Sequence, residues 1–581
     1  MEIAIFTPVS LIVMTLEDGK GEQILAIIFV FLLFSINLLV FQYTVDIREP
    51  WHGELSSGHH QWLSGSTLKF AKNWYRDGPL NLGFTLLENP SSIEFPDTLS
   101  RQPYVNYLPG CIIPLYVIGE LTATEPDAAL LMDYNLLNHF LIAFFLSILI
   151  FIFLRQIKID PVNSFLFATV PIFMELLLPG PLYWHQNVFF ADQAVILPFV
   201  AYILLEIIQD SYNGKYSRFL GVTQNLILFY GFLTDWLFVL IALTVYLKRI
   251  LEGKICFSRE NLAHSLKDNL KFWIVPFIAL AFFVIQVYSW GLTGTVLSKV
   301  LFRVGISSDS SATVNNGLIS FYQYITSGYG EIGFYALCFS LITMTFLFLY
   351  VLRERFITQN TDFRIKKIAA LMAMLFLPSI LQLILFKNHT LLHDFSVLKL
   401  SVPLATIPFV LAPVSWYLLV KNHIIKNHLK ISLTFKGRLL GKMNVNKLLK
   451  LDLILLVIFL VGTASASFYL ANEHPHYREL FPLGNSDYAV LGTSIQKNTQ
   501  YSDLVFSPNF EIPINPPQQL SYSMKRVYKI KSLDEIGNYT QGLSGYHVVI
   551  MFIGPPSPQW AEILANYPRI QDGNYYYYRL N

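Results

Sequence analysis

The chain has 581 residues, of which 54% are apolar and only 14% are charged. Because soluble globular domains contain about a quarter of charged residues, this composition excludes a soluble protein. The formal net charge of +2 indicates no class of partner by itself, and no nucleic-acid partner is expected.

Apolar runs recur along the chain, many of them near the roughly 20 residues that cross about 30 Å of hydrocarbon. We predict an α-helical polytopic membrane protein with about eleven transmembrane helices and a small α/β domain outside the membrane. The spans are expected near residues 24–44, 132–154, 162–178, 191–208, 219–233, 235–247, 272–291, 334–352, 368–386, 400–420 and 451–471.

The chain divides into three predicted parts. Residues 1–23 are expected to be cytoplasmic or interfacial, with Ile3–Met14 as an interfacial helix, because this apolar stretch lacks the basic start and the cleavage site of a signal peptide. Residues 24–471 form the transmembrane domain, which includes a first extracytoplasmic loop at 45–131. Residues 472–581 form the α/β domain, since strand-like runs alternate there with a helix-like stretch, at Asp503–Phe506, His547–Ile553, Pro558–Asn566 and Tyr575–Leu580.

Lysine and arginine are concentrated in alternate short connections, which predicts that these connections face the cytoplasm. The basic connections are 155–161, 209–218, 248–271, 353–367 and 421–450. The connections near 179–190 and 233–235 have no lysine or arginine. We therefore predict a multi-pass protein of the plasma membrane with a cytoplasmic N-terminus and an extracytoplasmic C-terminus.

Two segments admit two interpretations each. Residues 109–121 are apolar but short and contain two prolines, so we interpret them as a helix on the outer leaflet rather than a span. Residues 219–247 are either one long helix or two short helices that meet near Thr234–Trp236. The basic residues at both ends of this segment favour the pair.

The first loop opens with three acids, Asp46, Glu49 and Glu54, just beyond the first span. Glu54 to Tyr75 has helical length, and a carboxylate at the start of such a helix would be favoured in its ionised form. His59 and His60 follow these acids closely. The pattern predicts a site for acid–base chemistry, and solvated interfacial acids are the alternative.

Other ionisable residues flank the predicted outer ends of the spans. Arg101 precedes Pro103 and Tyr104, where a guanidinium suits a phosphate headgroup or simply anchors the loop to lipid. Asp192 begins a span close to His185 and either belongs to a site or caps the helix; Asp235 has the same two interpretations. The His393-Asp394 pair and Lys399 either grip an anionic headgroup or are solvated at the surface.

No nucleophile triad, zinc motif or phosphate-binding glycine loop stands out, which disfavours a nucleotide-driven pump and a soluble dinucleotide enzyme. A secondary transporter is the main alternative class. It would need internal repeats and ionisable residues deep in its spans, whereas the candidate residues here lie at the outer ends.

Three segments and the predicted topology resemble a known family. They are FAKNWYRDGPLNLGF at 70–84, SIEFPDTLSRQPYVNYLPG at 92–110 and HDFSVLKLSVP at 393–403. Together with an acid-bearing first outer loop and an outer C-terminal domain, they resemble the GT-C superfamily of membrane glycosyltransferases. The similarity is to the protein O-mannosyltransferase and aminoarabinose-transferase groups, in particular to archaeal members. The WWDYG signature of oligosaccharyltransferases is absent, so that branch is not expected.

The resemblance implies an inverting glycosyltransferase. It would move a monosaccharide from a polyprenyl (dolichyl or undecaprenyl) phosphate to a hydroxyl of a glycan, lipid or protein acceptor on the extracytoplasmic side. By this resemblance Glu54 ranks first as the catalytic base, ahead of Asp46 and Glu49, and no adjacent acidic pair is present. The expected phosphate-binding residues are Arg101, His393 and Lys399, and the expected substrate-binding residues are His59, His60, Tyr104, His185 and Asp192. No metal ligand is assigned and no cofactor is demanded, although a divalent metal stays open because GT-C branches differ.

Overall fold

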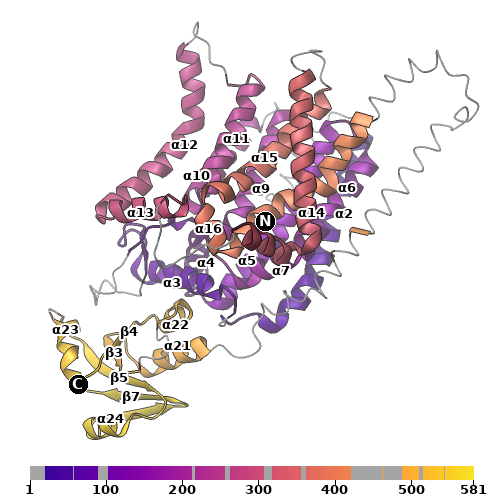
Figure 1. Cartoon of the computed structure of the whole chain (residues 1–581). Helices are drawn as coiled ribbons and strands as arrows, with labels where there is room; N and C mark the ends of the chain where they lie inside the picture. Colours follow the sequence, from indigo (N-terminus) through magenta and orange to yellow (C-terminus); the bar gives the residue numbers. More distant parts are fainter. Residues whose placement is uncertain are drawn as a thin grey trace, which may run out of the picture.

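The structure is a computed structural model. It describes residues 20–55, 58–88, 103–211, 216–255, 262–306, 317–354, 362–420, 462–463, 467, 487–509, 515–541 and 543–580. Within these residues, the chain forms a large helical bundle and a smaller part with a β-sheet (Figure 1).

Seven helical segments in the described ranges are long and apolar enough to cross a membrane, which makes the chain an integral membrane protein. They are α2 (Lys20–Arg48), α5 (Ala128–Gln156), α8 with α9 (Ala191–Ala194 and Ile196–Ser211), α12 (Leu262–Ser289), α14 (Gly317–Arg353), α15 (Phe363–Leu385) and the run that starts with η4 (Asp394–Leu400), α17 (Ser401–Thr406) and η5 (Ile407–Leu411). An eighth span is formed if α6 (Pro161–Leu177) and α7 (Pro179–Asn187), which are bent by 59°, count as one.

Every predicted span before residue 421 falls on a helix, but the predicted count of eleven is not confirmed, since the described residues contain seven or eight segments of spanning length. Some of the predicted spans form short or bent helices. The pair predicted within 219–247 is confirmed, since α10 (Ser217–Thr234) and α11 (Leu237–Leu251) separate at Asp235 and Trp236. The predicted span 451–471 lies almost entirely outside the described residues, as does the predicted interfacial helix Ile3–Met14.

The core of the bundle is built around α5. Every residue from Leu146 to Leu154 is buried, because this helix is apolar on all sides and contacts α2, α6, α7 and α9. Helix α2 instead buries one stripe, formed by Leu33, Asn37, Val40, Thr44 and Arg48 at the three- and four-residue spacing of a single helical face.

The first loop is folded against the bundle. It contains η1 (Glu49–Trp51), α3 (Gln61–Asp77), β1 (Leu86–Leu87), β2 (Pro103–Tyr104), η2 (Pro109–Cys111) and α4 (Ile113–Thr122). Helix α4 has 10 residues and is too short to span, in agreement with the interpretation of 109–121. The prediction that Glu54 opens the loop helix was wrong, because α3 begins at Gln61, directly after His60 in a left-handed conformation (φ 57°).

The connection predicted near 179–190 is not an open loop but forms the buried helix α7 and leads into the short buried helix α8. All nine residues of α7 are buried, and so is every residue of α8. Three prolines, Pro171, Pro179 and Pro181, lie at or near the bend, and proline at the first helical positions starts a new helix rather than continuing the previous one.

The smaller part contains a five-stranded mixed sheet in the order β4-β3-β5-β7-β6. Strand β3 pairs in parallel with β4 and β5, whereas β7 is antiparallel to β5 and β6. The bounds are α21 (Asp487–Asn498), β3 (Asp503–Ser507), α22 (Pro517–Ser523), β4 (Val527–Lys529), η6 (Leu533–Glu535), α23 (Ile536–Thr540), β5 (His547–Ile553), α24 (Pro558–Ile563), β6 (Arg569–Asp572) and β7 (Tyr575–Arg579). The predicted strands at 503–506, 547–553 and 575–580 agree with β3, β5 and β7.

The sheet-containing part is attached to the first loop by α22, which packs on α3. The backbone N–H of Leu55 donates to Tyr522 Oη at 2.9 Å. At Gly65 the helices approach so closely that a Cβ atom would lie 2.7 Å from the backbone nitrogen of Gln518.

Candidate functional site

Connections between the helices meet at one end of the bundle, which we call the polar end. It is formed by η1, α7, the α10–α11 junction, α13 (Thr293–Arg303), α16 (Lys387–Leu392) and η4. Figure 1 shows α3, α7, α13 and α16 on the side of the bundle that faces the sheet. Residues far apart in the sequence therefore become neighbours here.

A buried ionic cluster occupies the polar end. Lys399 Nζ lies 2.5 Å from Asp192 Oδ1 and 3.5 Å from Asp235 Oδ2, and all three side chains are at most 2% exposed. Gln382 Nε2 and the backbone N–H of Leu237 also donate to Asp235, at 2.9 and 2.7 Å. This arrangement explains why three charges are tolerated in an apolar bundle, since buried charges require ionic and hydrogen-bonding partners.

Arg303 is the second cation near these aspartates. Its guanidinium lies over the ring of Tyr107, 5.0 Å from the ring centre. Burial lowers the pKa of Arg303, because it disfavours the charged guanidinium. The pKa is nevertheless raised overall by electrostatic interactions with Tyr107, Tyr104, Asp192 and Asp235. Within the described part of the chain, no carboxylate lies within 4 Å of Arg303. Its charge therefore interacts with Asp192 and Asp235 at longer range and forms no direct ion pair with them.

Two further imidazoles border the cluster. The rings of His389 and His393 are 4.8 Å apart, and His393 stacks on Phe395 at 4.9 Å. Burial lowers the pKa of His389 to about 3 and also lowers the pKa of His393. Both rings are thus neutral near pH 7 and offer hydrogen bonds rather than positive charge.

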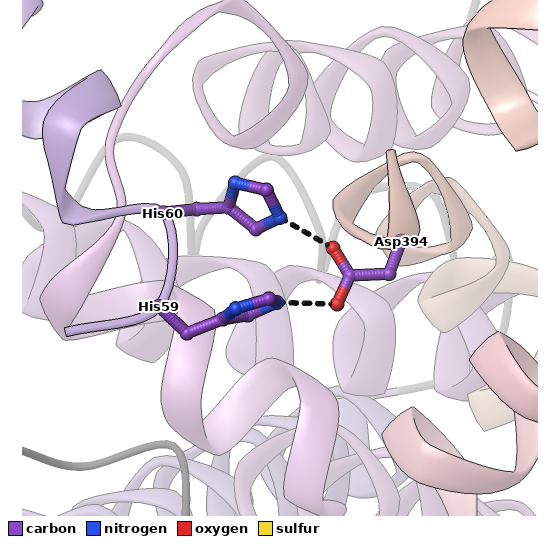
Figure 2. A group of neighbouring side chains, drawn as sticks. All are labelled: His59, His60 and Asp394. Carbon is purple, nitrogen blue, oxygen red and sulfur yellow. Dashed lines mark hydrogen bonds and ion pairs between the residues drawn. The ribbon is translucent and has the colours of Figure 1, made fainter. Parts of the chain in front are cut away.

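A second group joins the first loop to η4 (Figure 2). His59 Nε2 lies 2.6 Å from Asp394 Oδ2, and His60 Nε2 lies 2.8 Å from Asp394 Oδ1. Both imidazoles point toward the same carboxylate from one side. Two imidazole nitrogens and a carboxylate oxygen are a donor set that suits a divalent transition metal.

A third polar group lies beneath the polar end. Arg48, fully buried, donates to Thr44 O and Leu182 O at 2.9 and 3.1 Å and contacts His139 Nδ1 at 3.3 Å. His139 Nε2 donates to the backbone oxygen of Glu175 at 2.8 Å. These bonds fix the C-terminal end of α2 against α5, α6 and α7.

The three first-loop acids do not enter these groups. Asp46, Glu49 and Glu54 are all exposed, and Asp46 Oδ1 accepts a hydrogen bond from Gln42 Nε2 at 2.9 Å. The reason is helical geometry, because the buried stripe of α2 ends at Arg48 and Asp46 lies on the opposite face.

The other predicted site residues are scattered. Tyr104 is half-buried in β2, with its ring 5.9 Å from that of Phe190. His185 is fully buried, with Nε2 3.8 Å from Glu175 Oε1, and Asp192 is in the ionic cluster. Arg101 lies outside the described residues.

Sequence reasoning did not select Arg48, Glu175 or Arg303. The signal for Arg48 was available, since Leu33, Asn37, Val40, Thr44 and Arg48 share one helical face. No comparable signal marks Arg303, which becomes part of the site only because α13 packs beside α16. There Asn388 Nδ2 donates to Phe302 O at 2.9 Å.

The fold, unlike the sequence, matches known proteins. No family model matches the chain, and no curated protein sequence matches it. The apo crystal structure of the Archaeoglobus fulgidus oligosaccharyltransferase is similar, with a TM-score of 0.50, 10% identity and coverage of 90% of this chain and 69% of that one. The apo structure of ArnT from Cupriavidus metallidurans is also similar, with a TM-score of 0.50, 12% identity and coverage of 95% and 97%.

Identities of 10 and 12% establish likeness of fold. The likeness to these two structures agrees with the resemblance to membrane glycosyltransferases that the sequence predicted, and it concerns the fold alone. The chain is an integral membrane protein whose fold is similar to those of this oligosaccharyltransferase and of ArnT.

Proposed function

We propose that this protein is an inverting glycosyltransferase that moves a monosaccharide from a polyprenyl phosphate to an acceptor hydroxyl on the extracytoplasmic side. The observation that carries the proposal is the ionic cluster of Asp192, Asp235 and Lys399, with Arg303 near it, at the polar end of a GT-C-like fold. This location suits a donor whose prenyl chain stays among the helices while its phosphate is at the membrane surface.

The polar end is assigned to the extracytoplasmic side. Arg155, Lys248 and Arg249 lie in the last turns of α5 and α11, at the opposite end of these helices, and short lysine- and arginine-rich connections favour the cytoplasm. The sheet-containing part would then also be extracytoplasmic, because α22 packs on α3 at the polar end. The N-terminus would be cytoplasmic and the membrane the plasma membrane.

Arg303 is our choice for the donor phosphate. A departing polyprenyl phosphate is anionic, and a cation placed beside it stabilises the transition state. Lys399 is held by Asp192 and Asp235, and His393 is neutral near pH 7. Both are therefore weaker candidates than the Arg303 guanidinium, which has no ion-pair partner among the described residues. Arg101 stays a proposal on sequence grounds.

Glu49 is our choice for the base that takes the proton of the acceptor hydroxyl. It follows Arg48 directly, and the backbone oxygen of Arg48 accepts a hydrogen bond from Gln186 Nε2 at 3.0 Å, which anchors this turn to the polar end. A general base needs a fixed position near the reacting proton. Asp46 lies on the opposite face of α2, and Glu54 lies near Tyr522 of α22, so both rank lower.

The test is sugar transfer by the purified full chain from a panel of radiolabelled polyprenyl-phosphate sugars to a mixture of membrane acceptors. Glu49→Gln should lower the rate by about 10²–10⁴-fold, the usual contribution of a general base. Asp133→Asn is the matched control, since Asp133 is an exposed acid at the polar end that pairs with His52 at 2.8 Å, and it should retain activity. The proposal is wrong if no donor is turned over, and the assignment of the base is wrong if Asp46→Asn or Glu54→Gln has the larger effect.

A further inference from the structure

We propose that His59, His60 and Asp394 bind a divalent metal ion of the zinc class, which joins the first loop to η4. The possible ligand atoms of the three residues all lie within 4.8 Å of one another. They come from segments more than 330 positions apart in the sequence, as the separation of 335 between His59 and Asp394 shows. The proposal does not depend on the proposed glycosyltransferase activity.

The donor set fits the chemistry of zinc. Catalytic zinc sites commonly have three protein ligands, among them two imidazoles and one carboxylate, and leave a fourth position for another ligand. With zinc–ligand distances near 2.0–2.2 Å, tetrahedral ligand atoms are about 3.3 Å apart. The observed nitrogen–oxygen separations of 2.6 and 2.8 Å are shorter than this value, and all ligand atoms lie within 4.8 Å of one another, so the three side chains must adjust their spacing when an ion binds.

Only one oxygen of the carboxylate is satisfied as a hydrogen-bond acceptor, because Asp394 Oδ2 pairs with His59 Nε2 at 2.6 Å whereas Asp394 Oδ1 is without an aligned donor. Asp394 Oδ1 lies 2.8 Å from His60 Nε2, yet it is buried and accepts no hydrogen bond from the described residues. The imidazole nitrogen is therefore near the oxygen without being aligned with it, as expected when both atoms face a shared third position. The left-handed backbone of His60, with φ 57°, further indicates that tertiary contacts impose this position.

The surroundings supply outer-shell support and room for one more ligand. Tyr183 Oη donates to His59 O at 2.7 Å and fixes the loop. The ring of Trp184 lies 5.8 and 6.0 Å from the rings of His59 and His60 and shields them on one side. Asp394 also lines a small cavity with Trp184 and Tyr324, into which a fourth ligand could extend.

One contact must change when the ion binds. Trp62 Nε1 donates to His60 Nδ1 at 3.2 Å, which leaves the ring proton on Nε2 when His60 is neutral. Coordination through Nε2 moves that proton to Nδ1, where it opposes the indole N–H of Trp62. Trp62 is 40% exposed and can turn away, so Trp62→Phe should bind the ion at least as tightly as the native chain.

The experiment measures zinc binding to the purified full chain in detergent, by competition with a chromophoric chelator and by metal analysis after dialysis. We expect one tightly bound ion per chain, and a loss of affinity of about tenfold or more in His59→Ala, His60→Ala and Asp394→Asn. His52→Ala is the matched control, because His52 pairs with Asp133 at 2.8 Å at the same end of the bundle without a second imidazole. This variant should bind zinc like the native chain.

Folding is monitored in each variant by circular dichroism and elution volume, and Asp394→Asn preserves the shape of the side chain. Cobalt(II) in place of zinc should give the visible absorption of a four-coordinate ion, and Asp394→Asn should remove it. The proposal is overturned if the native chain binds no zinc, if His52→Ala lowers affinity as much as His60→Ala, or if Trp62→Phe abolishes binding. Because no sugar donor is present, failure here leaves the proposed function standing.

Discussion

The contact between α3 and α22 predicts how the sheet-containing part stays attached to the membrane-embedded part. Gly65→Ala places a Cβ atom 2.7 Å from Gln518 N, 2.8 Å from Pro517 C and 2.9 Å from Gln518 Cα. Ordinary Cβ contacts are 3.4–4 Å, so α22 must withdraw. Backbone atoms cannot rotate aside as a flexible side chain can, and overpacking of this kind costs about 1–3 kcal/mol.

Gly221→Ala is a close control for this substitution. Gly65 and Gly221 are each the fifth residue of their helix, α3 or α10, as the bounds Gln61–Asp77 and Ser217–Thr234 show. Both therefore gain a similar helix propensity on replacement by alanine, about 1 kcal/mol. No atom lies within 4 Å of the added Cβ at Gly221, so the difference between the two variants isolates the clash.

The assay is hydrogen exchange of the α22 amides together with thermal unfolding of the purified chain. Gly65→Ala should be less stable than Gly221→Ala by about 1–3 kcal/mol in the unit that contains α22, with faster exchange there. Exchange of the Leu55 amide should also rise, since this amide donates to Tyr522 Oη. Equal stability in the two variants, with unchanged exchange in α22, would show that the helices are not in this close contact.

Three further predictions concern charged groups. Lys399→Met should destabilise the chain by about 3–5 kcal/mol in thermal unfolding, because it leaves two buried carboxylates without their cation. Adding Asp192→Asn should restore part of this stability, and a double variant as unstable as Lys399→Met would refute the pairing. Arg303→Lys should raise the donor concentration needed for transfer without changing thermal unfolding, since lysine cannot bind a phosphate through two parallel hydrogen bonds. An unaltered dependence of the rate on donor concentration would exclude the phosphate role. Burial lowers the pKa of Lys69 to about 8, although Glu88 opposes this. The unfolded chain therefore binds more protons between about pH 8 and 10.5, and stability should rise with pH in that window. A flat profile that Lys69→Met leaves unchanged would contradict this prediction.

The sequence alone determined the membrane class and the positions of the helices. Apolar runs near 24–44 and 132–154 became α2 and α5 because backbone groups in hydrocarbon must be satisfied within a helix. The short strands were also predictable, since β-branched and aromatic residues are concentrated at His547–Ile553 and Tyr575–Arg579. These features depend on local composition and periodicity, both of which are available from the sequence alone.

The candidate site was predicted only in part. Asp192 and Lys399 were selected as ionisable residues next to predicted spans, and His59 and His60 because they follow the first-loop acids, but the partners of all four could not be identified. Asp192 and Lys399 lie far apart in the sequence, with the helices α9 to α16 between them. They meet only because α8 contacts η4 in the folded bundle.

The three first-loop acids were predicted as site residues because they lie close to the membrane. In the structure they are exposed, and Arg48, which lies between Asp46 and Glu49 in the sequence, is buried instead. Which residues of a loop reach the interior depends on the helical phase of α2 and on the bends at His60 and Pro179. Composition predicts that a polar residue is costly to bury, but only packing between distant segments supplies the partner that makes its burial stable. For this protein the sequence therefore determined the helices and the chemical types at their ends, and the tertiary structure decided which of those residues form a site.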